Sequence, residues 1–271
     1  MRKFKKFLLL PIIFLLAFTL AACGNKKQNT YQKVKQDNTI VWGVRADTRL
    51  FGLMSIKTGR VEGFEIDLAN AITKQMLGEN GHAKLTKITA NTRIPLLKNN
   101  NVDVLMATMT ITPDRQKQVL FSKPYFKAGQ GILVPDNSKI KTVQQLNNKT
   151  VLAVKGTTAV ANVHKYAPKA KVLEYGDYGQ AFSALKAGQG VAMTTDSGLL
   201  AGIASENPGY KLAGSNFTNE PYGIAVNKGQ TQMVKHINKA LDELKKNGTY
   251  NRLIRKWFKG VKGFNIKEVE E

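Results

Sequence analysis

The chain has 271 residues and a mass of 29.9 kDa, a length that favours two lobes over one compact domain. Its 42% hydrophobic fraction excludes a disordered chain, its single cysteine excludes an internal disulfide, and no Cys/His spacing typical of zinc is present. The 41 basic and 19 acidic side chains give a net charge of +22. The basic residues are dispersed and no nucleic-acid-binding motif is present, so we expect no nucleic-acid partner. A polyanionic surface such as an acidic cell envelope is the favoured partner for this charge.

The N-terminus has the layout of a secretory signal peptide. Residues 2–6 carry four basic side chains and no acid, and residues 7–22 are apolar except for Thr19. This apolar run is shorter than the roughly 20 residues that a membrane-spanning helix needs, and an uncleaved membrane anchor is the alternative interpretation. The sequence therefore predicts a signal peptide over residues 1–22.

The residues Leu20-Ala21-Ala22-Cys23 resemble a bacterial lipobox. The resemblance implies that Cys23 is acylated and becomes the first residue of the mature chain, which holds the protein on the outer face of the bacterial cytoplasmic membrane. Loss of residues 1–22 removes four bases and no acid, so the net charge of +22 becomes +18. Residues 23–38 are expected to form a flexible polar tether, because the segment after Cys23 is rich in Lys, Gln and Asn.

The next segment alternates between strand and helix patterns. Residues 39–44 are a short β-branched run, and Gly63 precedes a helix whose apolar residues recur every fourth position from Phe64 to Met76. The following predicted elements are strands at 84–88 and 102–106 with a helix at 94–97 between them. This order indicates a parallel sheet covered by helices.

A second set of the same kind begins after residue 125. Its predicted strands are 151–154, 171–173 and 191–194. Three helices are predicted between and after them: one that begins at Thr157, one over 178–186 and one over 197–204. Two amphipathic helices close the chain, the first ending at Asn247-Gly248. Their apolar faces are formed by Met233, Ile237, Leu241 and Leu244, and by Tyr250, Leu253, Ile254 and Trp257.

These last two helices have no strands of their own, so we expect them to pack on the first set. That packing requires the chain to cross between two lobes twice, near residues 126–134 and 218–226, which makes a two-strand hinge. The expected division is lobe 1 at 39–126 plus 222–260, lobe 2 at 128–216, and a C-terminal tail at 261–271. A ligand cleft is expected between the lobes, at the carboxyl ends of their strands.

Several short motifs occur in order along this region. They are GFEIDL at 63–68, TMTITPDR at 108–115, FSKPY at 121–125, KGTT at 155–158, PYGIA at 221–225 and NGTY at 247–250. Together they resemble the polar amino acid-binding proteins of ABC importers, over residues 39–260. The resemblance implies a type II periplasmic-binding-protein fold, of the α/β class, that closes over a free amino acid and delivers it to a membrane permease.

The resemblance also implies partners for the two charged ends of an amino acid. Burying either charge unpaired costs several kcal/mol, so each needs an opposite charge. Arg115 corresponds to the arginine that clamps the α-carboxylate with a bidentate fork, and Thr108 and Thr110 line the same loop. Asp196 resembles the aspartate that accepts a hydrogen bond from the α-ammonium group, and Thr158 is expected to bind the ligand from lobe 2.

The residues alone leave ordinary alternatives open for these side chains. Arg115 lies beside Asp114, a pattern that is common in surface ion pairs. Thr158 is also suited to cap a helix, and Asp196 could cap the helix that starts at Ser197. One carboxylate can serve only one of these two roles well.

Arg45 and Arg93 are assigned to the side chain of the ligand through the same resemblance. Arg45 lies where relatives read the far end of the ligand, and the segment 92–97 resembles one that supplies a second Arg in glutamate and aspartate binders. Two guanidiniums favour a carboxylate, so glutamate or aspartate is expected ahead of glutamine, although members assigned to glutamine share this segment. Phe51 is expected to form an aromatic wall of the site.

Other classes of function find less support in the sequence. No enzyme motif is present, and the three histidines have no paired nucleophile motif, so we expect no catalysis, no cofactor and no metal. A few proteins of this fold are dehydratases, so the fold alone does not exclude an enzyme. A surface adhesin that holds acidic matrix or wall polymers is a further alternative, and it is compatible with transport.

Overall fold

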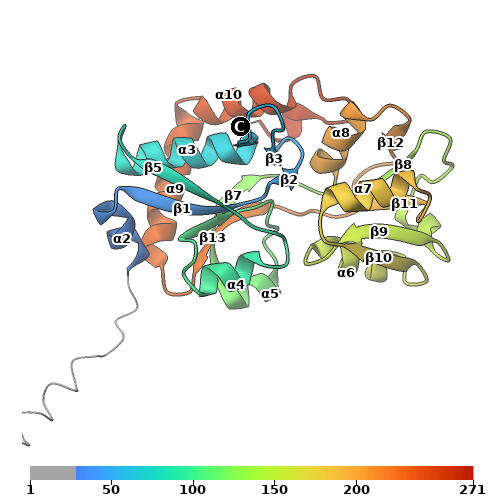
Figure 1. Cartoon of the computed structure of the whole chain (residues 1–271), viewed down its shortest axis with the longest axis horizontal. Helices are drawn as coiled ribbons and strands as arrows, with labels where there is room; N and C mark the ends of the chain where they lie inside the picture. The colour runs from blue at the N-terminus through green and yellow to red at the C-terminus, as the bar shows by residue number, and fades with distance from the viewer. Residues whose placement is uncertain (1–28, 271) are drawn as a thin grey trace, which may run out of the picture.

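A computed structural model describes residues 29–270 and shows two α/β lobes beside each other (Figure 1). The expected signal peptide and Cys23 lie outside the described residues. Within residues 29–270, no helix is long and apolar enough to cross a membrane. The same residues contain no group of three or more His, Cys, Asp and Glu side chains that could hold a metal ion.

Lobe 1 contains a five-stranded sheet in the order β5-β1-β6-β13-β7. The strands are β1 (Thr39–Val44), β5 (His82–Lys87), β6 (Val104–Met106), β7 (Val119–Phe126) and β13 (Tyr222–Asn227). β1 is parallel to β5 and β6, with Trp42 opposite Leu85 and Val104, whereas β13 is antiparallel to β6 and β7. Lobe 1 is therefore assembled from two separate stretches of the chain.

Helices cover both faces of this sheet (Figure 1). One face is covered by α3 (Phe64–Leu77), α9 (Thr231–Lys246) and α10 (Thr249–Phe258), and the other by α4 (Arg93–Lys98) and α5 (Pro113–Gln118). The repeating apolar positions of α3 and α9 are buried: Phe64, Leu68, Ile72, Met233, Ile237, Leu241 and Leu244. The last two helices thus pack on lobe 1, because their apolar faces meet the sheet and α3.

A small antiparallel sheet connects β1 to α3. It consists of β2 (Asp47–Thr48), β3 (Gly52–Met54) and β4 (Val61–Glu62). Gly63, between β4 and α3, has a φ of 153°, and a Cβ there would lie 2.1 Å from the carbonyl oxygen of Phe51. Only glycine fits this approach, so the turn that starts the GFEIDL motif has a structural reason.

Lobe 2 contains a second five-stranded sheet, in the order β10-β9-β11-β8-β12. Its elements in chain order are β8 (Gln130–Pro135), η2 (Val143–Leu146), β9 (Thr150–Val154), α6 (Thr158–Tyr166), β10 (Lys171–Tyr175), α7 (Tyr178–Lys186), β11 (Ala192–Asp196), α8 (Ser197–Glu206) and β12 (Tyr210–Leu212). β9, β10 and β11 are parallel, and β8 is antiparallel to both β11 and β12. The carboxyl ends of β9, β10 and β11, which are followed by α6, α7 and α8, supply the lobe 2 side of the site.

Two segments connect the lobes, one between β7 and β8 and the other between β12 and β13. They are bonded to each other, because the Glu220 amide donates to the Ala128 carbonyl at 2.7 Å and the Gln130 amide donates to the Thr218 hydroxyl at 2.9 Å. The chain therefore crosses between the lobes through a paired hinge.

The segment expected to be a flexible tether contains a helix, α2 (Thr30–Gln36), which corrects that expectation for these residues. Asn29 caps the helix through bonds from the amides of Tyr31 and Gln32, and Val34 is fully buried. The Tyr31 ring also stacks on His236 of α9 with a centroid separation of 3.7 Å. The polar composition misled the sequence reading, because a helix this short needs few apolar residues to dock on a neighbouring surface.

The residues after α10 also pack on lobe 1. Val269, beside the short helix η3 (Ile266–Glu268), is buried, and its carbonyl accepts a bond from the Tyr250 hydroxyl at 3.4 Å. The Phe264 ring lies 4.9 Å from the Phe258 ring. The segment expected as a C-terminal tail is therefore part of the folded body through residue 270.

Candidate functional site

The candidate site is a small, nearly filled cavity between the lobes. Seven of the eight ligand-binding residues proposed from the sequence line it: Arg45, Arg93, Thr108, Thr110, Arg115, Thr158 and Asp196. Thr157 and Tyr178, both from lobe 2, complete the lining. Residues separated by more than 150 positions in the chain thus meet in one place, which makes the cavity the first candidate for ligand binding.

Phe51 does not line this cavity, so its expected role as a ligand wall is corrected. Its side chain is 1% exposed and lies in an aromatic cluster, 4.9 Å from the Phe126 ring and 5.2 Å from the Phe258 ring. The neighbouring Leu50 has a φ of 69°, and this turn is part of the path that carries Phe51 into the core. The aromatic residue of the cavity is Tyr178, at the start of α7, which the sequence analysis did not identify.

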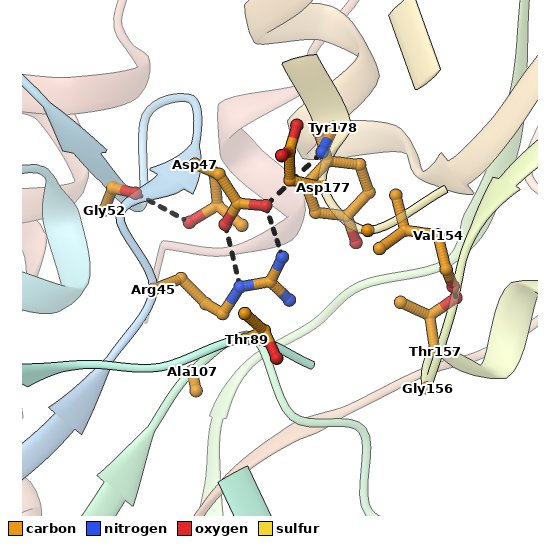
Figure 2. Close-up of polar contacts among 12 residues, drawn as sticks. Arg45, Asp47, Gly52, Thr89, Ala107, Val154, Gly156, Thr157, Asp177 and Tyr178 are labelled. Atoms are coloured by element: carbon orange, nitrogen blue, oxygen red, sulfur yellow. Dashed lines mark hydrogen bonds and ion pairs between the residues drawn. The ribbon is translucent and has the colours of Figure 1, made fainter. Parts of the chain in front are cut away.

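Arg45 forms a bidentate ion pair with Asp47, as Figure 2 shows. Its Nε donates to Oδ1 at 2.8 Å and its Nη2 donates to Oδ2 at 2.5 Å. The guanidinium carbon lies 5.2 Å from the centre of the Tyr178 ring. The third nitrogen, Nη1, is buried and has no hydrogen-bond partner among the described residues, so it is a donor available to a ligand.

The Asp47 carboxylate also connects the two lobes. It belongs to β2 of lobe 1 and accepts a bond at 3.3 Å from the Tyr178 amide, which is the first residue of α7 in lobe 2. A carboxylate is favoured at the start of a helix, because the helix dipole places partial positive charge there. Nothing in the sequence pattern marked Asp47, since the contact depends on a residue 131 positions away.

Arg93 and Arg115 of lobe 1 both reach the Gly156 carbonyl of lobe 2, each at 3.3 Å. Arg93 also donates to the Ala107 carbonyl at 2.7 Å, and Arg115 donates to the Thr110 carbonyl at 2.9 Å. Burial, together with the positive charges of Arg115 and Arg45, lowers the pKa of Arg93 to about 9. Three guanidiniums crowded in this way favour an anionic group beside them.

The backbone of Gly156 allows this close approach of the lobes. Its φ is 79°, and a Cβ there would lie 2.8 Å from the Cα of Asn91 in lobe 1. The glycine of the KGTT motif therefore permits both the turn and the contact between the lobes. The structure is a closed arrangement, in which lobe 1 side chains bond directly to the lobe 2 backbone.

Asp196 supplies a carboxyl group to the cavity from the end of β11. It accepts a bond from the Tyr222 hydroxyl, and its side chain does not cap α8, which removes the ordinary alternative raised by the sequence. Burial, with the nearby negative charge of Glu220, raises the pKa of Asp196 to about 7. A cationic group in the cavity would oppose this effect and favour the ionised carboxylate.

Glu65 and Glu220 are two buried acids that the sequence analysis did not identify. Glu65, in the first turn of α3, accepts bonds from the Thr108 amide at 2.7 Å and from the Tyr125 hydroxyl. Burial raises its pKa to about 7, and its Oε2 has no partner among the described residues. Glu65 thus holds the backbone of Thr108, whose φ is 44°, in an unusual left-handed conformation.

Glu220 joins both lobes to the hinge. Its Oε2 accepts from the Thr110 hydroxyl of lobe 1 at 2.8 Å and from the Thr158 hydroxyl of lobe 2 at 2.5 Å. Thr158 therefore uses its hydroxyl for the hinge carboxylate, while it also lines the cavity at the start of α6. An anion is favoured at this helix start.

The residues that line the cavity suit a small molecule that carries both charges. Guanidiniums and the start of α6 suit a carboxylate, and Asp196 suits an ammonium group. None of the residues that line the cavity is a histidine or a cysteine. The arrangement is thus one of binding groups that surround a zwitterion.

Residues 40–260 match the bacterial extracellular solute-binding proteins, family 3. The ABC transporter glutamine-binding protein GlnH of Bacillus subtilis is 48% identical over 267 residues, 94% of this chain and 98% of that protein. A glutamine-binding protein of Geobacillus stearothermophilus is 45% identical over 214 residues, 79% of this chain and 80% of that protein.

Solved structures agree with the observed topology. The solved structure of an ancestral arginine-binding protein bound to glutamine superposes with a TM-score of 0.77 at 40% identity, covering 82% of this chain and 98% of that one. The type II periplasmic-binding-protein fold expected from the sequence is confirmed. The relatives are solute-binding proteins of transporters, which confirms the expectation of a binding protein rather than an enzyme.

Proposed function

Because the chain belongs to the bacterial extracellular solute-binding proteins, family 3, we propose that it captures one polar amino acid outside the cell membrane and delivers it to an ABC permease. The observation that carries this proposal is the cavity, in which Arg115 and Asp196 supply opposite charges from opposite lobes. Arg115 holds the α-carboxylate and Asp196 holds the α-ammonium group. A ligand that bridges the two lobes stabilises their closed arrangement through its contacts with both.

The ligand that fits the side-chain end of this cavity is glutamine. The sequence favoured glutamate or aspartate because it offered two arginines, Arg45 and Arg93. In the structure Asp47 pairs with Arg45 through two bonds, so this guanidinium already has an anionic partner within the protein. The positive charge of Arg45, which a carboxylate at the side-chain end of the ligand would need, is therefore largely balanced by the protein itself.

A carboxamide suits the remaining hydrogen-bonding groups. Its oxygen accepts from the unpartnered Nη1 of Arg45 and brings no additional charge into the cavity. A carboxylate in the same place adds a negative charge near Asp47 and Glu65, which disfavours it. The names of the two similar proteins, both glutamine binders at 48% and 45% identity, point in the same direction.

The attachment to the membrane is the second element of the proposed function. The lipobox at 20–23 implies a mature chain that is acylated on Cys23 and held on the outer face of the cytoplasmic membrane. A tethered binding protein stays close to its permease, which raises the effective concentration of one for the other.

Isothermal titration calorimetry of the chain from residue 24 tests the ligand assignment. The helices and strands that the structure describes lie within residues 29–270, so this chain keeps all of them. Glutamine, glutamate, aspartate and arginine should each be titrated at equal ionic strength. Glutamine should bind most tightly, and tighter binding of glutamate or arginine would show that the charge balance at Arg45 has been misread.

A further inference from the structure

The end of lobe 1 that carries α2 has a cluster of basic side chains, which we call the α2 patch. It consists of Lys33, Lys35, Lys98, Lys228, Lys235 and Lys239. These residues come from α2, the end of α4, the turn after β13 and the first half of α9. A groove joins three of these elements, lined by Thr30, Lys33, Lys98, Asn100, Asp103, Asn227, Lys228 and Gln230.

Little acidic charge opposes the α2 patch. The three segments that form it, 29–38, 98–103 and 227–239, contain Asp37 and Asp103 as their acids. Asp103 is already engaged, since it pairs with Lys33 at 2.8 Å. Lys98 and Lys228 are exposed and form no ion pair within residues 29–270.

The electrostatic effect of the patch is visible at His236, which stacks on Tyr31 at the contact of α2 with α9. Burial lowers the pKa of this imidazole, and the positive charges of Lys235, Lys239 and Lys35 lower it further. Three lysines from two helices therefore act together on this one side chain. Such a field attracts a dense negative layer rather than a single ion.

The chain itself determines what this surface faces. The described body begins at Asn29, which caps α2, and Thr30 lines the groove of the patch. The apolar segment 7–22 and Cys23 come shortly before Asn29 in the sequence. The chain therefore reaches the body beside the patch, whether the anchor is an acylated Cys23 or an uncleaved apolar segment. The six steps from Cys23 to Asn29 span about 20 Å at most. The anchor thus keeps the α2 patch close to the membrane.

We propose that the α2 patch rests on the anionic phospholipid headgroups of the membrane to which the protein is attached. Basic side chains next to a membrane anchor bind acidic lipids in this way, with an attraction that is limited to about a Debye length. Figure 1 shows α2 at the end of lobe 1 that is farthest from lobe 2. In this orientation the cavity between the lobes stays away from the bilayer and accessible to solute. This contact rests on the proposed membrane attachment and is independent of which amino acid the cavity binds.

Vesicle co-sedimentation of the chain from residue 24, which lacks Cys23, tests the patch without the anchor. Vesicles of phosphatidylcholine with phosphatidylglycerol are compared with pure phosphatidylcholine at low salt. The variant K98E/K228E reverses two charges of the α2 patch. The matched control K149E/K171E reverses two exposed charges in lobe 2, so the net charge of the two variants is equal.

The wild type and K149E/K171E should bind the vesicles that contain phosphatidylglycerol and not those of pure phosphatidylcholine. The variant K98E/K228E should bind the anionic vesicles about tenfold more weakly than the wild type. Unchanged melting temperatures establish that the variants are folded. If K98E/K228E fails to fold, the variant K235Q/K239Q, which removes two other charges of the α2 patch, takes its place. Absence of wild-type binding, or equal losses in both variants, would overturn the proposal. So would a patch variant that loses binding to a glycerol phosphate wall polymer and keeps its binding to vesicles.

Discussion

Replacement of Asp47 with Asn tests whether the protein's own carboxylate sets the preference for an amide. The variant Asp47→Asn removes one negative charge, keeps the side-chain size and leaves Arg45 an oxygen acceptor. A ligand carboxylate on the free Nη1 of Arg45 would lie about 6 to 8 Å from the Asp47 carboxylate, given the width of a guanidinium. With an effective dielectric constant of about 20, the repulsion between the two is about 2 to 3 kcal/mol.

Local relaxation reduces this value, so we expect Asp47→Asn to lower the preference for glutamine over glutamate by about tenfold, or about 1.4 kcal/mol. Calorimetric titration of both amino acids into both proteins gives the ratio. Asp177→Asn is the matched control, because Asp177 caps α7 next to Tyr178 without a bond to Arg45, and Asn caps a helix equally well. An unchanged ratio in Asp47→Asn, or the same change in Asp177→Asn, would refute the reasoning.

Arg115→Ala and Asp196→Ala should each weaken binding of every amino acid by about 2 to 5 kcal/mol in calorimetry, because one buried charge of the ligand loses its partner; near-normal affinity would place the zwitterion elsewhere. Glutamine affinity should fall by up to about tenfold per pH unit below pH 7, because the pKa of Asp196, raised from 3.8 to about 7, makes the ammonium group compete with a proton. In the empty protein the raised pKa of Asp196 stabilises the fold at low pH, and this stabilisation is lost as the pH rises through about 7. Saturating glutamine should therefore raise the melting temperature more at pH 8 than at pH 5. Equal increments at the two pH values would contradict this linkage. Gly156→Ala should prevent full closure, since its φ is 79° and the new Cβ would meet the Asn91 Cα at 2.8 Å; small-angle scattering should then show no decrease in radius of gyration with ligand, and a normal decrease would count against the closed contact. Cys23→Ala should leave a folded protein that no longer incorporates labelled lipid, and continued incorporation would disprove the lipobox assignment.

The parts of the fold that the sequence predicted are those with a periodic apolar pattern. The stripe of α9, from Met233 to Leu244, required a sheet to cover it, and the structure supplies the sheet of lobe 1. The helix α2 was missed for the opposite reason. Its one fully buried residue, Val34, gives no period, and its docking depends on a stack with His236, which is distant in the sequence.

The candidate site was predictable where a motif fixes both a residue and its surroundings. Arg115 follows the helix cap Thr112, and its guanidinium bonds to the Thr110 carbonyl of the same loop, so the TMTITPDR segment positions it locally. No local motif fixes the direction of the Phe51 side chain, and it packs in the aromatic core rather than against the cavity. Whether each lining residue touches the amino acid stays a prediction.

The selectivity of the site was not predictable by counting arginines. Asp47 lies two residues after Arg45, a spacing that in an extended strand usually means only a shared face. Its role became evident through the Tyr178 amide of lobe 2, which donates a third bond to the Asp47 carboxylate. Long-range contacts between lobes therefore decide the balance of charge that the ligand meets.

A crystal structure of the chain from residue 24 with glutamine tests the central claim most directly. The account predicts that the α-carboxylate lies on Arg115, the α-ammonium group on Asp196, and the amide oxygen within hydrogen-bond distance of Arg45 Nη1, with Asp47 still paired to Arg45. Glutamine bound outside this cavity, or an Asp47 carboxylate displaced from Arg45 by the ligand, would contradict it.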